Sequence, residues 1–218
     1  MFIGHIAVAL AAKRIAPRTS LGVLVLAAQL PDVIWPVLVL AGLEKVEIHP
    51  GDTAFTPLNF VSYPWSHSLL LVILTGAVAG YCYRAGTKDL RGGRAVMFLA
   101  VSHWVLDWLS HRADLPLYPG GSLYGLGLWN SVPATLVIEG ALFAAGIALY
   151  LQATQAKDRA GHYAFWSLIA FLTVIYVANL KGSPPPSDSA IAWVGIIGAV
   201  VLFAWAQSAD RHRQPKDR

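Results

Sequence analysis

Histidine and aspartate residues stand inside apolar stretches of this sequence, at a spacing that suits metal coordination. His103, Asp107 and His111 are four residues apart, so on a helix they lie on one face. Imidazole nitrogen and carboxylate oxygen are ligands of zinc, iron and manganese. The pair His103 and Asp107 is therefore expected either to supply two ligands to one metal ion or to form a hydrogen bond that ties helices together.

Three other ionisable residues lie in local contexts that favour a function. Asp32 follows Pro31, which removes a backbone hydrogen bond and bends a helix. His67 stands at a helix start, where the dipole favours a neutral ring that can bind metal; the alternative is an interfacial histidine. Glu139 has no cation in its own helix. It is expected to act as a general acid or base, to lie beside a metal site, or to serve packing alone.

The estimated depths of these residues in the membrane place most of them in one layer. With a rise of about 1.5 Å per residue, His5, Asp32, His103 and Asp107 lie about 12 to 21 Å from the basic ends of their segments. Glu139 lies about 12 Å below the opposite surface. A carboxylate near the bilayer centre costs about 2.5 to 3.5 kcal/mol, so it needs a partner or a function. We therefore predict that these residues converge, although they come from different segments.

The composition indicates which scaffold positions them. Only 13% of the 218 residues are charged and 56% are hydrophobic, whereas soluble domains carry about 25% charged residues. Runs of about 20 apolar residues predict an all-α, polytopic transmembrane bundle with six long spans. The six spans are Ser20–Leu43, Trp65–Arg84, Gly93–Ser110, Ser131–Gln152, His162–Leu180 and Ala190–Ser208. Met1–Ala12 is too short to cross and is expected to be a short membrane-embedded helix.

The basic residues predict the orientation of the bundle. Most of the 16 Lys and Arg residues fall in loops on one side if six spans alternate, and cationic loops stay in the cytoplasm. The Arg84–Arg94 loop and the C-terminus are therefore predicted to be cytoplasmic, and the Glu44–Pro64 and His111–Asn130 loops external. The basic clusters are topological signals and do not support nucleic-acid binding. A single cysteine, Cys82, excludes an intrachain disulfide and a cysteine-based zinc motif.

The order of the motifs resembles the YdjM-like family of membrane-bound, predicted metal-dependent hydrolases. The resemblance rests on an early histidine, on Leu-Pro-Asp, on His-Ser at the start of a span, and on Ser-His-x-x-x-Asp. In this chain these are His5, Leu30-Pro31-Asp32, His67-Ser68 and Ser102-His103 with Asp107. The motifs cover residues 1–120 of a single integral membrane domain, residues 1–218, whose further spans lie within residues 131–208. The family is thought to be distantly similar to zinc-dependent phospholipase C and nuclease P1.

The resemblance implies a divalent metal ion, with zinc expected, and hydrolysis of an ester or phosphoester, including that of a lipid-like substrate near the outer leaflet. The implied metal ligands are His5, Asp32, His67, His103 and Asp107. The metal would activate a water molecule for attack, and Glu139 or His111 would move the proton. The chain has one carboxylate and one histidine fewer than the usual family pattern, and Glu139 and His111 are the candidates to replace them.

Two other functions remain open from the sequence. The same carboxylates and histidines could form the proton or cation pathway of a small transporter. Against this, no inverted repeat is visible and the cytoplasmic halves of the spans are apolar. The residues could also hold together the helices of a non-catalytic membrane scaffold. In each case we expect a multi-pass protein of the inner (plasma) membrane, with membrane lipid as a partner and a cytoplasmic C-terminus.

Overall fold

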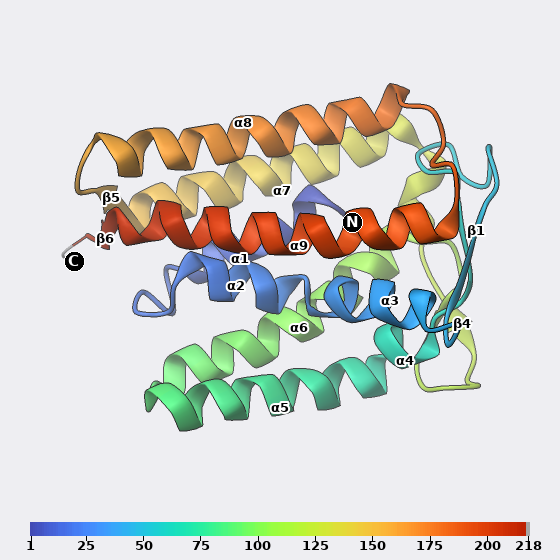
Figure 1. Ribbon diagram of the computed structural model, residues 1–218, viewed down its shortest axis with the longest axis horizontal. Coiled ribbons are helices and arrows are strands. Elements are labelled where there is room, and N and C mark those ends of the chain that lie inside the picture. The colour runs from blue at the N-terminus through green and yellow to red at the C-terminus, as the bar shows by residue number, and fades with distance from the viewer. Residues whose placement is uncertain (217–218) are drawn as a thin grey trace.

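The computed structural model describes residues 1–216, and in this part the chain is mostly helical (Figure 1). The long helices run side by side along the longest axis of the molecule. The α-helices are α1 (Ile3–Ala12), α2 (Leu21–Ala28), α3 (Leu30–Leu40), α4 (Pro64–His67), α5 (Leu69–Thr87), α6 (Leu90–Ser110), α7 (Val132–Ala153), α8 (Arg159–Lys181) and α9 (Asp188–Arg211). A short 3-10 turn, η1 (Leu128–Asn130), leads into α7.

Short antiparallel strand pairs lie in the loops at both ends of the bundle. The strands are β1 (Lys45–Ile48) with β2 (Leu58–Ser62), β3 (Leu115–Pro116) with β4 (Leu123–Tyr124), and β5 (Thr154–Ala156) with β6 (Arg213–Pro215). The first two pairs lie at one end, which we call the hairpin end. The third lies with the C-terminus at the other, which we call the tail end. The helical bundle agrees with the prediction, whereas these strands were not predicted.

The number of membrane spans differs from the prediction. Four helices, α5, α7, α8 and α9, are long and apolar enough to cross a bilayer, and α2 with α3 adds a fifth if the bent pair is one span. The predicted six spans are therefore not supported. The difference lies in α6, which is long enough at 21 residues but carries Arg91, Arg94 and Asp107. Less than a third of each of the four spanning windows is buried inside the protein, so their apolar surfaces are free to face lipid.

The short N-terminal helix lies inside the bundle. Eight of the ten residues of α1 are buried, among them Ile6 and Leu10. α1 packs against α2, α6 and α7, and its approach to α7 is close at Gly146. A Cβ atom there would lie 2.5 Å from the Ala7 carbonyl oxygen, so only glycine allows this packing. The contact fixes the position of His5 on α1.

The long span predicted around Pro31 is a broken helix. α2 ends at Ala28 and α3 begins at Leu30, and the two helices are bent by 57°. Pro31 stands in the first turn of α3, where its missing N–H costs nothing. The break has two consequences: Asp32 is placed in the first turn of α3, and the Ala28 carbonyl, at the end of α2, is released from helical hydrogen bonding.

Candidate metal centre

Five predicted ligands, contributed by four helices, converge in the interior of the bundle; we call them the site cluster. They are His5 from α1, Asp32 from α3, His67 from α4, and His103 and Asp107 from α6. Two overlapping groups have their ligand atoms within 4.8 Å of one another. The first is His5, His103 and Asp107, and the second is Asp32, His67 and His103. His103 belongs to both, so the two groups form one site.

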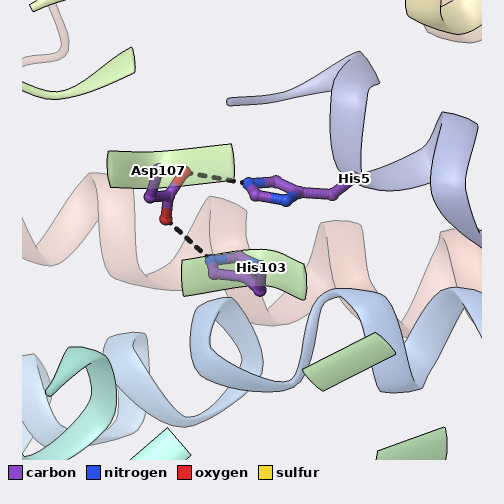
Figure 2. Close-up of side chains that lie close together, drawn as sticks. All are labelled: His5, His103 and Asp107. Atoms are coloured by element: carbon purple, nitrogen blue, oxygen red, sulfur yellow. Dashed lines mark hydrogen bonds and ion pairs between the residues drawn. The ribbon is translucent and has the colours of Figure 1, made fainter. Parts of the chain in front are cut away.

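Asp107 is the centre of the first group, as Figure 2 shows. Its two carboxylate oxygens point to different histidines: Oδ1 lies 3.0 Å from His5 Nε2, and Oδ2 lies 3.0 Å from His103 Nε2. The rings of His5 and His103 are stacked, with centroids 3.8 Å apart. His67 Nε2 lies 3.8 Å from Asp107 Oδ2 and 3.5 Å from Asp32 Oδ1. The imidazole Nε2 atoms thus converge on the two carboxylates.

The break between α2 and α3 orients His103. The Nδ1 atom of His103 lies 2.8 Å from the Ala28 carbonyl oxygen, which can only accept a hydrogen bond. Nδ1 therefore carries the proton of the neutral ring, an assignment that follows from the hydrogen-bond network. The Nε2 atom is then left with a lone pair, facing the Asp107 carboxylate without a hydrogen-bond partner among the described residues. Two acceptors that face each other are satisfied by a proton on Nε2 or by a cation bound between them.

His67 is oriented in the same way by a residue far away in sequence. Glu44 is buried and accepts hydrogen bonds from the backbone N–H groups of Trp65 and Ser66, each at 2.8 Å. The Ser66 hydroxyl donates to Glu44 at 2.6 Å, and its oxygen lies 2.7 Å from His67 Nδ1. The Nδ1 atom of His67 therefore donates to Ser66, and its Nε2 atom is free to act as a ligand. Such carboxylate-linked histidines are typical of metal sites.

His111 lies at the edge of the site cluster and has its own supporting residues. Its Nδ1 atom is 3.1 Å from Asp114 Oδ1, and its Nε2 atom is 3.9 Å from Asp107 Oδ1. The Tyr63 hydroxyl donates to the same Asp114 oxygen at 2.6 Å. Burial, with the nearby Asp114 charge, raises the pKa of the Tyr63 hydroxyl well above its usual value, so Tyr63 remains a donor. His111 is thus oriented with Nε2 towards Asp107.

Glu139, a predicted residue of the site, and Met1, which was not predicted, have contacts of a different kind. Glu139 is fully buried, and its Oε2 atom accepts hydrogen bonds from the backbone N–H groups of Phe2 and Gly4, at 3.1 and 3.3 Å. These groups lie at the start of α1, so Glu139 holds the helix that carries His5, and it is not one of the clustered ligands. The Met1 amino group contacts Asp107 and donates to the Ser110 hydroxyl.

The donor set fits a zinc-like divalent ion. Three histidines and two carboxylates can supply the nitrogen and oxygen ligands that zinc accepts, and zinc sites use three or four of them. Four histidines surround Asp107, and in three of them, His67, His103 and His111, Nδ1 lies within hydrogen-bond distance of an oxygen atom of the protein. The Nε2 atom of each ring therefore remains available as a metal ligand. Asp32 is the open side of the cluster, because its side chain is 40% exposed while that of Asp107 is 3% exposed. The site cluster is therefore open to its surroundings on the Asp32 side.

A comparison with models of protein families identifies the same family that the order of the motifs resembles. A model of the YdjM inner membrane protein family matches residues 1–183. The chain belongs to this family. The match extends beyond the motifs of the first 120 residues and includes α7 and α8, so the family region contains Glu139. No curated protein and no solved structure matches the chain. The distant similarity of the family to phospholipase C and nuclease P1 therefore stays an expectation.

Three supporting groups were not predicted from the sequence. They are Glu44, Asp114 and the Ala28 carbonyl oxygen. The Ala28 oxygen contacts His103, Asp114 contacts His111, and Glu44 contacts Ser66, the neighbour of His67. Glu44 and Asp114 lie in predicted external loops, where a carboxylate is ordinarily solvated. The only signal for Asp114 is its position three residues after His111, and no signal in the sequence points to Glu44.

Proposed function

We propose that this protein is a membrane-embedded, metal-dependent hydrolase of esters or phosphoesters. One observation carries the proposal: the ligand atoms of His5, Asp32, His67, His103 and Asp107 converge, with His103 Nε2 only 3.0 Å from Asp107 while its Nδ1 is held by the Ala28 carbonyl oxygen. A divalent ion bound among these five side chains would satisfy both His103 Nε2 and Asp107. When bound, zinc would supply Lewis acidity and an activated water for attack on an ester or phosphoester.

The residues around the site can perform the remaining steps of hydrolysis. His111 lines the cavity that leads to the site and is held through Nδ1 by Asp114. Its Nε2 atom can accept a proton from the attacking water and return it to the leaving oxygen as the bond between phosphorus or acyl carbon and that oxygen breaks. We assign the proton transfer to His111, because Glu139 is engaged with the start of α1. Glu139 then acts by positioning His5.

The membrane arrangement that fits this function is the one predicted from charge. The family and the apolar helices indicate an inner-membrane protein. We propose that α6 also crosses the bilayer, shielded by its neighbours, so that the six long segments alternate and the tail end lies in the cytoplasm. The site cluster would then lie in the half of the membrane nearer the external surface, where an ester of the outer leaflet could reach it.

Metal analysis of the purified protein tests the proposal. The protein is purified without chelator, equilibrated with zinc and freed from unbound ions, and its metal content is measured by mass spectrometry. We expect about one zinc ion or more per chain, with hydrolysis of p-nitrophenyl phosphate or p-nitrophenyl acetate that chelator removes and zinc restores. A metal content near zero would reject the hydrolase and leave a transporter or scaffold. Bound zinc without turnover of either ester would reject the catalytic part alone.

A further inference from the structure

A large cavity begins at the site cluster and continues into the apolar part of the bundle. It has a volume of about 680 Å³, within the range of ligand sites in proteins. Asp32, His67, Asp107 and His111 line one part of it. The rest is formed mainly by apolar residues of α2, α3, α8 and α9. The candidate metal centre and this apolar space are therefore one continuous cavity.

The apolar part of the cavity reaches the lipid-facing surface of the bundle. Several large hydrophobic residues that line the cavity are between 36% and 71% exposed. They are Leu26, Phe171, Val194, Ile197 and Val201. In a membrane their exposed surfaces face hydrocarbon chains and not water. The cavity is thus open sideways, to the interior of the bilayer.

Two glycines of α9 have different roles beside the cavity. At Gly195 a Cβ atom would lie 2.9 Å from Pro36 Cγ, so this glycine allows α9 to pack against α3. At Gly198 a Cβ atom would meet no heavy atom within 4 Å. Gly198 therefore lines the cavity without a packing need for a small residue, and the space beside it is available to a ligand.

Polar groups without partners lie near the site end of the cavity. Gln29, Trp35 and Trp129 line it, and each has a buried side-chain atom with no hydrogen-bond partner among the described residues. Buried polar atoms are usually paired. Each of these atoms is covered by protein, so a lipid head becomes a partner for the two indole N–H groups and the amide oxygen only when the side chains turn towards the cavity.

We propose that this cavity binds the hydrocarbon chain of a lipid phosphoester, with the phosphate beside the divalent ion that the site cluster would hold and the chain lying beside Gly198. The lipid enters sideways from the bilayer between α8, α9 and the broken helix of α2 and α3. This inference rests on the proposed function for the identity of the reacting group. A hydrocarbon chain suits the space because its occupant must be apolar along the cavity and polar at the site end. Hydrolysis adds water across the phosphoester bond, so the products are the lipid alcohol and the freed phosphate group.

Photocrosslinking of a lipid tests the binding site without any turnover. The probe is a diacylglycerol, the lipid alcohol that hydrolysis of a phosphatidic acid would release, with a diazirine in one acyl chain, added to metal-free protein in detergent. Gly198→Phe fills the cavity, and Ala204→Phe adds the same ring to an exposed position of α9 that does not line it. We expect crosslinks on the segment that contains Leu26 and Asp32, reduced about tenfold by Gly198→Phe only. Equal crosslinking in all three proteins, or crosslinks on α5 alone, would overturn the proposal.

Kinetics of the zinc-loaded protein separate this inference from the proposed function. Gly198→Phe should raise the KM for a long-chain phosphatidic acid about tenfold more than the KM for p-nitrophenyl phosphate, whereas Ala204→Phe should leave the ratio of the two KM values unchanged. Turnover of the soluble ester with no effect of Gly198→Phe on the lipid would overturn the chain site and keep the hydrolase. Crosslinking as expected with no turnover of either substrate would keep the lipid site and reject the hydrolase.

Discussion

Two buried polar clusters, one at the candidate metal centre and one near the tail end, differ in how their charges are matched. In the second, which we call the tail cluster, Lys13, Tyr150 and Asp210 come together. Lys13 Nζ lies 2.5 Å from Asp210 Oδ2 and 2.8 Å from the Thr19 carbonyl oxygen. The Tyr150 hydroxyl donates to Asp210 Oδ1 at 3.0 Å. One cation and one hydroxyl are thus paired with one carboxylate, so donors and acceptors are balanced.

The site cluster lacks this balance. Asp32 and Asp107 bring two carboxylates together, and among the described residues the only ammonium group beside them, that of Met1, contacts Asp107 and not Asp32. The surrounding histidines turn Nε2 towards both carboxylates. His103 and His67 have their Nδ1 hydrogens engaged by oxygen atoms of the protein, so their Nε2 atoms are acceptors. A buried polar network serves packing when its donors and acceptors match, as at the tail end. An excess of acceptors around one point indicates a place for a cation.

The largest effect is expected when the centre of the site cluster loses its charge. Asp107→Asn keeps the volume of the side chain but removes the anionic ligand between His5 and His103. We expect zinc affinity to fall at least about 10³-fold, equivalent to about 4 kcal/mol, while the protein still inserts and purifies. Metal titration followed by mass spectrometry measures this. Unchanged zinc affinity would show that Asp107 is a packing residue.

The corresponding aspartate-to-asparagine substitution in the tail cluster should lower the stability of the fold and leave metal binding unchanged. Asp210→Asn leaves the buried Lys13 ammonium without a carboxylate, and breaking a buried ion pair costs about 3 kcal/mol or more. We expect the free energy of unfolding to fall by about 3 kcal/mol, with zinc affinity unchanged. Denaturant titration in detergent gives the first quantity, and the zinc titration gives the second. A loss of zinc binding here would remove the distinction between the two clusters.

A smaller effect is expected from the residues that support the ligands. Ser66→Ala removes the hydroxyl that connects Glu44 to His67 Nδ1. Loss of such a partner lowers metal affinity about 10-fold, and we expect this value for zinc. Ser66→Thr keeps the hydroxyl and should restore the affinity. If alanine and threonine behave alike, the hydroxyl does not orient His67.

The smallest effect is expected at the surface of the tail end. Hydrogen bonds from His212 and from the Gly161 N–H hold the pKa of Asp158 below its usual value. A carboxylate whose pKa is lowered by folding stabilises the fold above its unfolded pKa of about 3.9, and this contribution is lost as the pH falls through the lower folded value. Asp158→Asn should therefore lower the unfolding midpoint slightly at pH 7, progressively less as the pH falls below about 3.9, and not at all below the folded pKa. A difference that persists in acid would contradict this account.

Features of the fold that depend on residues close together in the sequence could be predicted from it. The i, i+4 spacing places His103 and Asp107 on one face of α6, because helix geometry depends only on the backbone. Pro31 predicted the bend in the first long segment, and the break lies beside it. The number of membrane spans could not be predicted from such local patterns. α6 has the length of a membrane helix but is not among the helices apolar enough to cross a bilayer. Its placement therefore depends on contacts with its neighbours.

The sequence by itself determined which residues are too costly to leave unpaired in an apolar bundle, and the tertiary structure decided what each is paired with. His5, Asp32, His67, His103 and Asp107 were recognisable because burial of an ionisable group requires a partner. That Glu139 holds α1, that Glu44 orients His67 through Ser66, and that a cavity joins the site to the surface of α9 depend on contacts between distant segments. Such contacts follow from side-chain packing in three dimensions, which no local pattern of residues encodes.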